Sequence, residues 1–446
     1  MSALALTAAL WFATDPTASR VDVSGGAAIE VRGGRAPTQP TADPEPAVLS
    51  ILTPDVDMEV ASRRGTLFNL GYTPRVQYRY PNRIGVNRPL LLHQGYATLA
   101  QQLDPRWLLG VNLGGSVGEA DYNSAPLVLE DNTQAPDVSV LEIAAATAGV
   151  DVEGRLTRRH TLGFGADVVY RTPLDVPEVD DPDAQVSSGG IPEQLNVNGE
   201  VSLDTRVTAV DAVEVAVSPG YFNYNEGDTQ FVTTQATGQW RRQIRPSLSS
   251  SLGAGVFGST GVGGTRTNGL MPVALASVTG ALVRSASHNV DATVVAGVTP
   301  YFDRVRVQLD PRATLNATVV VALPPRWSVR VLAGGVTNAT TRPRTLDNDG
   351  GEDVRTVTET QVRLGVPVTY QINEQQQFEF GLLMSARAPH LRSDRFEFNQ
   401  GETWLYVAYR IGAGTARGGQ EVGQANRGAV TRSARGEASA ASGGRR

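Results

Sequence analysis

The chain contains the stretch Leu103-Asp104-Pro105-Arg106-Trp107-Leu108-Leu109-Gly110-Val111-Asn112-Leu113-Gly114-Gly115, and a close variant recurs as Leu323-Pro324-Pro325-Arg326-Trp327-Ser328-Val329-Arg330-Val331-Leu332-Ala333-Gly334-Gly335. In each copy a Pro turn is followed by an Arg-Trp pair and then by a segment that ends in small residues. After the Trp of the first copy, alternate positions are apolar, and those between them are mostly small or polar. A strand with one apolar face, one small polar face and an aromatic residue at its base is typical of a transmembrane β-barrel.

Three further segments alternate in the same way, over residues 66–80, 194–206 and 305–321. Strands of soluble sheets are usually only about 5 or 6 residues long. Segments that keep a period of two for so much longer therefore favour strands that cross a bilayer. No run of about 20 apolar residues is present, so the sequence predicts no transmembrane helix.

The connections between these segments alternate in length. Short turns are predicted near residues 63–65, 104–105, 158–159, 209–212, 243–244, 285–287, 324–325 and 373–374. Longer loops are predicted at 121–137, 173–193, 260–268, 342–353 and 391–400, with shorter members of the same set at 81–87, 225–228 and 303–304. Short turns on one rim and longer loops on the other are the layout of bacterial outer-membrane barrels, in which the short turns are periplasmic.

The strand count follows from these turns. Eight short turns account for 16 strands, residues 402–411 add a last one, and residues 21–33 add a first one before a Pro-rich loop at 36–54. The sequence therefore predicts a single all-β domain, an antiparallel up-and-down β-barrel of about 18 strands. If the first strand fails at its Gly25-Gly26 interruption, the count falls to about 16.

Two terminal segments flank the barrel, which we place at residues 20–412. Residues 1–19 resemble a signal peptide, because residues 3–12 form a short apolar run followed by small polar residues, although the basic start is missing. Residues 413–446 carry six Arg and two Glu among Gly, Ala, Ser and Gln, and we predict a disordered basic tail. This tail either contacts an acidic periplasmic partner or peptidoglycan, or is a solvated low-complexity end.

The composition of the chain argues against several classes of function. The net charge of −6 argues against a nucleic-acid binder, and the absence of Cys removes disulfides, thiolate metal sites and Cys nucleophiles. The four histidines do not share a face with a Ser and an acid, and no phosphate loop, dinucleotide fingerprint or zinc spacing is present. Residues 347–353 resemble a fragment of a calcium loop but lack its distal Glu, so an acidic hairpin tip is the better interpretation. We therefore expect no enzyme, no cofactor and no metal site.

If the apolar faces point to lipid, the opposite faces line a lumen. The lumen-lining candidates are Arg75, Arg79, Arg155, Arg171, Arg206, Arg241, Arg306, Arg312, Arg330, Arg363, Arg387, Glu200, Asp204, Glu359 and Glu379. The chain has no Lys, so all of its basic side chains are planar Arg donors suited to carboxylate, phosphate or hydroxyl groups. A slight Arg excess favours anionic or hydroxyl-rich solutes. Alternatively, the charges pair across strands and merely solvate the wall.

Aromatic residues at the ends of strands predict the membrane boundaries. Trp107 and Trp327 follow short turns, and Tyr78 and Tyr80 end a strand that runs into a longer loop. Trp and Tyr concentrate at membrane interfaces because their rings are amphipathic. We therefore assign these four residues as interface anchors, with lumen chemistry on the opposite face of the same strands.

The chain resembles bacterial outer-membrane β-barrels, and the resemblance rests on the repeated Leu-x-Pro-Arg-Trp unit, on the Gly-rich strand that follows it and on the turn pattern. In size and layout the chain is also similar to 18-stranded myxobacterial-type porins for polysaccharide export. This resemblance implies a porin in the outer membrane of a Gram-negative bacterium, in contact with the lipid bilayer. It also implies a conduit for surface polysaccharide that works with periplasmic export proteins. A passive diffusion porin for small solutes and a non-transporting structural or adhesive barrel are the alternatives.

Overall fold

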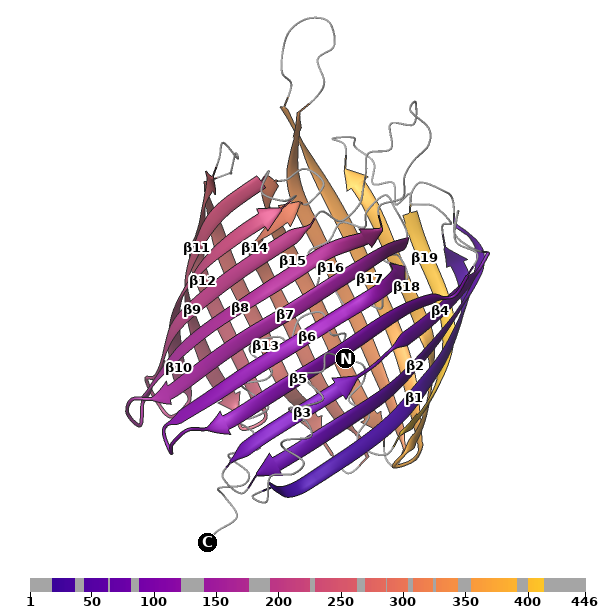
Figure 1. The fold of residues 1–446 in the computed structure, drawn as a ribbon, viewed down its shortest axis with the longest axis horizontal. Coiled ribbons are helices and arrows are strands. Elements are labelled where there is room, and N and C mark those ends of the chain that lie inside the picture. Colours follow the sequence, from indigo (N-terminus) through magenta and orange to yellow (C-terminus); the bar gives the residue numbers. More distant parts are fainter. Residues whose placement is uncertain are drawn as a thin grey trace, which may run out of the picture.

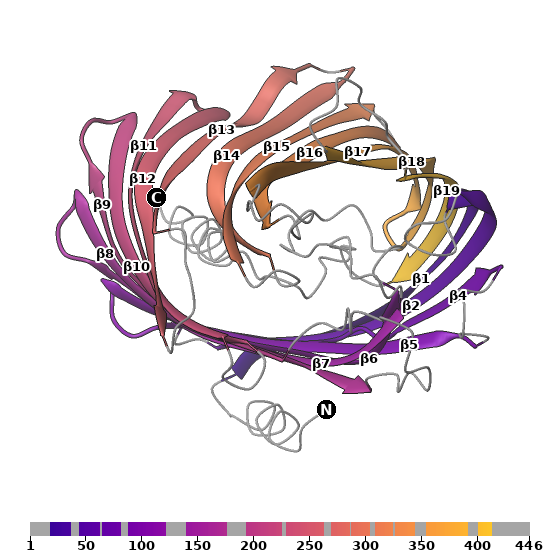
Figure 2. The same ribbon diagram turned by 90° about the horizontal axis from the view of Figure 1, so that it is seen from above.

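A computed structural model describes residues 18–36, 44–62, 65–81, 88–121, 140–175, 193–224, 229–262, 269–285, 287–303, 308–323, 326–343, 354–390 and 400–412. These residues form one antiparallel sheet that closes on itself into a barrel with tilted strands (Figures 1 and 2). The strands are β1 (Ala18–Ala36), β2 (Glu45–Ser62), β3 (Thr66–Tyr72), β4 (Arg75–Tyr80), β5 (Leu90–Gln102), β6 (Trp107–Asp121), β7 (Val140–Arg155), β8 (His160–Asp175), β9 (Gln194–Arg206), β10 (Asp211–Tyr224), β11 (Thr229–Arg245), β12 (Leu248–Val262), β13 (Leu270–Arg284), β14 (Asn289–Asp303), β15 (Gln308–Leu323), β16 (Trp327–Pro343), β17 (Val354–Asn373), β18 (Gln376–His390) and β19 (Gln400–Gly412). No helix among the described residues is long and apolar enough to cross a membrane.

The barrel has 18 crossing strands, as the turn pattern predicts, because β3 and β4 are two parts of one strand. The registers on either side of the break pair Val56 with Tyr72 and Leu52 with Val76, which places Pro54 opposite Pro74. Proline has no N–H to donate to a neighbouring strand. The ladder is therefore interrupted between β2 and this strand without a change of register.

The first strand forms despite its glycines, so the count of 16 does not apply. β1 pairs with β2 along its length and with β19 from Gly26 to Arg35, and this second pairing closes the barrel. Gly26 lies opposite Gly412, and a Cβ on Gly26 would approach the Ile411 carbonyl oxygen to 2.8 Å. Small residues are therefore required where the two terminal strands meet at the lower end of this seam.

The predicted Pro-rich loop at residues 36–54 was wrong in its second half, because β2 begins at Glu45. Its alternating residues Ala47, Leu49 and Ile51 are buried. The described prolines of this stretch, Pro44, Pro46 and Pro54, lie just before the strand, at its start and at the interruption opposite Pro74, where a missing N–H is tolerated. Periodicity, rather than proline content, therefore identifies this strand.

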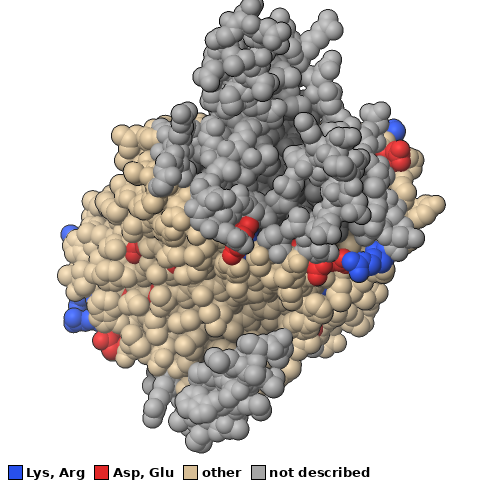
Figure 3. All heavy atoms as spheres, turned by 45° about the horizontal axis from the view of Figure 1, so that its top comes forward, with Lys and Arg blue, Asp and Glu red and all other residues tan. Residues whose placement is uncertain are grey.

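Every strand has an apolar outer face. Opposite residues of an antiparallel pair point to the same side, and the outward positions include Leu113, Leu315 and Leu405, which are 52%, 54% and 66% exposed. The space-filling view likewise shows few charged side chains on the visible outer wall (Figure 3). This wall faces lipid, because a water-facing surface would not carry a continuous apolar belt.

The strand ends that are joined by short connections lie at one end of the barrel, where β1 begins and β19 ends, and the strand ends that are joined by longer connections lie at the other (Figure 1). We call these ends the short-turn rim and the long-loop rim. By the general layout of bacterial barrels, the short-turn rim is periplasmic.

The assignment of the two faces is tested by adjacent residues of β15. Leu315→Arg places a charge on the lipid-facing wall, and we expect it to lower the free energy of unfolding by about 2–4 kcal/mol. Asn316→Arg, on the opposite face, leaves its charge in water and should lower that free energy by less than about 1 kcal/mol. Urea unfolding in lipid vesicles measures both, and equal destabilisation would contradict the assignment.

Candidate functional site

The inner wall of the barrel carries most of the charged side chains that the strands hold at membrane depth. Lumen-facing carboxylates in the half of each strand nearer the short-turn rim are Asp22, Asp55, Asp57, Glu59, Asp151, Glu153, Asp167, Asp204, Glu214, Asp291 and Glu379, with Glu200 midway along β9. Lumen-facing guanidiniums in that half are Arg155, Arg206, Arg241, Arg284, Arg330 and Arg410, and Arg284 forms an ion pair with Asp291 at 2.6 Å. Carboxylates therefore outnumber guanidiniums there among the described side chains.

The long-loop half has the opposite balance. Its described lumen-facing charges are Arg32, Arg75, Arg79, Arg171, Arg312 and Arg363 against Glu30, Glu45 and Glu402. The two signs are thus separated along the barrel axis. A count over the whole chain hides this separation, because the opposite charges nearly cancel.

One cluster joins three strands on the inner wall. Arg241 of β11 forms ion pairs with Asp204 of β9 and with Glu214 of β10, the latter at 3.2 Å between Nη2 and Oε2. All three side chains are about one-quarter exposed, so solvent screens the pairs only partly. Arg241 therefore offsets charge locally, which supports the interpretation that some lumen charges pair across strands.

Other carboxylates of the short-turn half bond to neutral donors. Tyr96 donates to Asp57 at 2.7 Å and Tyr406 to Glu379 at 2.8 Å between oxygens, and Asn198 donates to Asp167 through its amide at 3.1 Å. A neutral donor orients a carboxylate without cancelling its charge. The negative field of this half of the lumen is therefore preserved at these positions.

Near the long-loop rim the inner wall is partly apolar, which sequence reasoning missed. One cluster comprises Phe231, Phe257, Met271 and Val273, with Phe222 packed against it. A second comprises Ala36, Ala47, Leu49, Ile51 and Trp404, with Leu383 packed against it. Counting back in twos from Arg241 along β11 reaches Phe231, so strict use of the period would have predicted that the first cluster faces the lumen.

Buried arginines accompany the second cluster. The Arg79 guanidinium lies 6.0 Å from the Trp404 ring centroid and donates to the Ala36 carbonyl at 3.2 Å, and Arg32 contacts Glu30. Arg32, Arg79 and Arg312 are each about 5% exposed. These side chains are part of the packed wall and are not open to a solute in the way that half-exposed lumen residues are.

The structure places the sequence-predicted lumen residues as follows. Inward-facing positions hold Arg75, Arg79, Arg155, Arg171, Arg206, Arg241, Arg312, Arg330, Arg363, Glu200, Asp204 and Glu379. Arg306 lies outside the described residues, and the side chains of Arg387 and Glu359 are not described, although both residues belong to strands. Of the predicted set, the structure brings Arg241 and Asp204 into direct contact.

The predicted anchors lie on the outer face at the two rims. Trp327 is 43% exposed and packs against Tyr370 at 4.6 Å and Phe380 at 6.5 Å between ring centroids. The Trp107 ring covers Gly154, where a Cβ would approach it to 2.4 Å. Tyr78 and Tyr80 are exposed at the long-loop end of β4.

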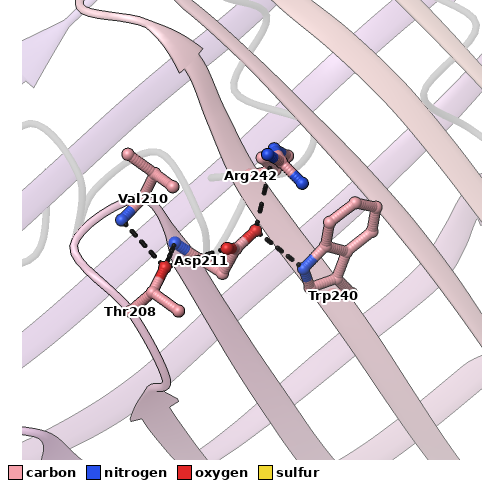
Figure 4. A network of polar contacts seen from close by, with 5 residues as sticks. All are labelled: Thr208, Val210, Asp211, Trp240 and Arg242. Carbon is pink, nitrogen blue, oxygen red and sulfur yellow. Dashed lines mark hydrogen bonds and ion pairs between the residues drawn. The ribbon is translucent and has the colours of Figure 1, made fainter.

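Trp240 is a further outward-facing aromatic residue near the short-turn rim that the sequence analysis overlooked. Its indole N–H donates to Asp211 at 3.1 Å, and Arg242 lies 5.9 Å from the Trp240 ring centroid and 3.9 Å from the same carboxylate (Figure 4). Thr208 fixes the adjoining turn by accepting from the Val210 and Asp211 backbone N–H groups. The sequence position of Trp240 could have indicated this, because it lies near the end of a strand, five residues before Arg245.

The carboxylates and histidines of the described residues are not gathered into a metal-ligand group. No group of three or more His, Asp or Glu side chains among these residues is arranged to hold a metal ion. Their carboxylates are instead spread along the lumen wall, where they act as fixed charges.

A closed antiparallel barrel with an apolar outer belt and aromatic residues at both rims is a protein of the Gram-negative outer membrane. No protein-family model and no curated protein matches the sequence. Solved structures with a similar fold include OpdK of Pseudomonas aeruginosa, at 12% identity over 88% of this chain and 99% of that one with a TM-score of 0.43. OccAB4 of Acinetobacter baumannii is 11% identical over 90% and 100% with a TM-score of 0.42. The siderophore receptor PirA of Pseudomonas aeruginosa is 8% identical over 88% and 80% with a TM-score of 0.44. Likeness this distant bears on neither solute nor mechanism.

Proposed function

We propose that the chain is an outer-membrane diffusion channel for small hydrophilic solutes, which was the alternative interpretation of the sequence. The observation that carries this proposal is the closed 18-strand wall, apolar outside and charged inside. A barrel of this size has a lumen wider than its own wall side chains fill. Half-exposed polar residues along that wall keep water in contact with a crossing solute.

The charge pattern supports weak ion selectivity. The long-loop guanidiniums that are only half-buried, Arg75, Arg171 and Arg363, attract anions, and carboxylates in the short-turn half attract cations. Because an ion that crosses the barrel meets both fields, each half opposes the ion that the other favours. We therefore propose passage of neutral or modestly charged solutes rather than strict selection of anions, the preference that a slight Arg excess had suggested.

Export of surface polysaccharide was the main interpretation of the sequence, and a wall for sliding sugars is expected to expose aromatic rings for stacking. The lumen-facing Phe231, Phe257, Trp404 and Tyr406 are instead buried in the wall, and Phe222 and Tyr96 are half-buried. We therefore propose a small solute as the cargo. Polysaccharide export with periplasmic partners is the alternative that the gene-deletion experiment below tests. The structural or adhesive barrel is the alternative that the conductance experiment below tests.

The channel function is tested with the purified full-length protein in planar bilayers. We expect discrete conductance steps in salt and swelling of proteoliposomes in small sugars, because an open lumen of this width admits hydrated ions. Protein that inserts and shows the heat-dependent gel migration of a folded barrel, yet never conducts, would favour the structural barrel.

The cargo is tested by deleting the gene in its own host. We expect normal surface polysaccharide and slower uptake of small solutes, restored by the wild-type gene. Loss of surface polysaccharide with unchanged solute uptake would instead favour the export conduit.

Adjacent residues of β11 test which side chains face the pore. Arg241→Gln removes the cation between Asp204 and Glu214, so the cation-to-anion permeability ratio should rise by roughly two- to threefold. Arg242→Gln is the matched control, because Arg242 lies on the outer face beside Trp240 and should leave the ratio unchanged. Reversal potentials across a salt gradient measure both, and an equal shift in the two variants would contradict the assignment.

A further inference from the structure

Three carboxamide side chains follow one another on the inner face of β9. Gln194, Asn196 and Asn198 occupy alternate positions in the long-loop half of this strand. They share their face with Asp204, which contacts Arg241 in the lumen. Alternate residues of a strand are about 7 Å apart, so the three amides form a row along the inner wall. We call these three residues the carboxamide ladder.

Two members of the ladder carry an acceptor oxygen that has no hydrogen-bond partner among the described residues. These atoms are Oε1 of Gln194 and Oδ1 of Asn196, and both are buried. Gln194 as a whole is 4% exposed, whereas Asn196 is half-buried and so reaches the lumen. Because almost all buried polar groups in proteins are paired, unpaired oxygens at two successive positions indicate a donor that comes from outside the wall.

The third amide borders a space that a glycine leaves in the wall. Asn198 donates its amide N–H to Asp167 at 3.1 Å, and its oxygen lies toward β10. A Cβ on Gly220 of β10 would approach that oxygen to 2.9 Å and the Thr233 hydroxyl oxygen to 2.6 Å. Glycine within a strand often marks a place where a ligand approaches closely. Polar oxygens therefore converge above Gly220, next to the ladder.

An aromatic surface lies on the other side of this space. Phe222 of β10 lies opposite Asn196 and stacks on Phe231 of β11, with 5.4 Å between ring centroids and 21° between ring planes. Phe231 is buried, whereas Phe222 is half-buried. A partly exposed aromatic ring beside a row of amides suits a ligand with an apolar C–H face and polar edges.

The unpaired atoms restrict the chemistry of that ligand. An amide oxygen only accepts hydrogen bonds, so a carboxylate or a fully ionised phosphate, which also only accept, cannot satisfy it. An ammonium group would donate, but it would place a second positive charge beside Arg171, which lies opposite Gln194 on β8. A hydroxyl group is uncharged and both donates and accepts, so it can pair with the oxygen and the amino group of a carboxamide.

We infer that the carboxamide ladder and Phe222 bind a neutral, hydroxyl-rich solute of one or two sugar rings. This inference rests on the proposed channel function and names its solute class. Hydroxyl groups of the solute donate to Gln194 and Asn196, and the C–H face of a ring packs on Phe222. A single half-buried ring beside the ladder suits one bound sugar unit rather than a continuous track for a polymer.

Single-channel currents of the full-length protein in salt, with maltose added on both sides, test this site. Maltose should reduce the current in a saturable manner, because an occupied site narrows the lumen. Gln194→Met with Asn196→Leu keeps the side-chain sizes similar and removes both unpaired oxygens. Loss of two hydrogen bonds should raise the half-blocking concentration about tenfold. Asn316→Leu is the matched control, because it makes the same change on the inner face of β15 and should leave that concentration within about twofold.

Permethylated maltose tests the direction of the hydrogen bonds, because it keeps both rings but has no O–H donor. We expect it to block the native channel about tenfold more weakly than maltose. A channel that conducts salt but shows no saturable block by maltose or glucose would overturn the site and leave the channel function intact. A block that the double variant does not weaken, or that permethylated maltose reproduces, would likewise overturn it.

Unfolding temperatures, followed by heat-dependent gel migration, give a measurement that does not depend on conduction. Maltose should raise the unfolding temperature of the native barrel but not that of the double variant, because a ligand that binds only the folded state stabilises it. Without maltose, Gln194→Met should itself raise this temperature, because apolar atoms replace a buried oxygen that has no partner. A lower temperature for Gln194→Met would show that the oxygen is already bonded within the barrel, and this result would overturn the inference.

Discussion

The wall of this protein depends on backbone hydrogen bonding in a medium that offers no other partner. Lipid cannot satisfy N–H and C=O groups, so a sheet within it has to close. Closure is made by β1 and β19, which lie at opposite ends of the sequence and meet through Gly26 and Gly412. The interruption at Pro54 and Pro74 leaves the register the same on both sides of the break. It therefore does not change how the first and last strands meet, and the other contacts of the wall depend on that closure.

Once the sheet is closed, the period of two decides whether each side chain faces lipid or the lumen. Trp240, Arg241 and Arg242 illustrate this division within one turn-proximal segment of β11. Trp240 and Arg242 meet Asp211 on the outer face, whereas Arg241 joins Asp204 and Glu214 inside. A shift of the register by one residue would place the inner ion pairs in lipid and the indole in water, so the register itself is strongly specified.

The same period explains how much the sequence could predict. The strand number, the lipid-facing residues and the two Arg-Trp turns follow from local patterns, because hydrophobic alternation and short turns are encoded within a few residues of each other. The contact of Arg241 with Asp204 is not local, since it spans β10 and needs the registers of two strand pairs at once. The start of β2 was missed because its prolines outweighed the alternation of Ala47, Leu49 and Ile51, and the apolar inner clusters were missed because a lumen was assumed to be polar throughout.

The axial separation of charge has a physical cause in the wall as well as a consequence for solutes. Arginines near the long-loop rim sit beside aromatic and aliphatic side chains, as Arg79 does beside Trp404, and a delocalised, weakly hydrated guanidinium tolerates such burial. Carboxylates need more hydration, and several of those at the short-turn end lie where Tyr and Asn donate to them. The chemistry of burial therefore sorts the two signs along the axis. A pore sorted in this way opposes small ions of either sign in one half, which suits passage of solutes whose own charge is low.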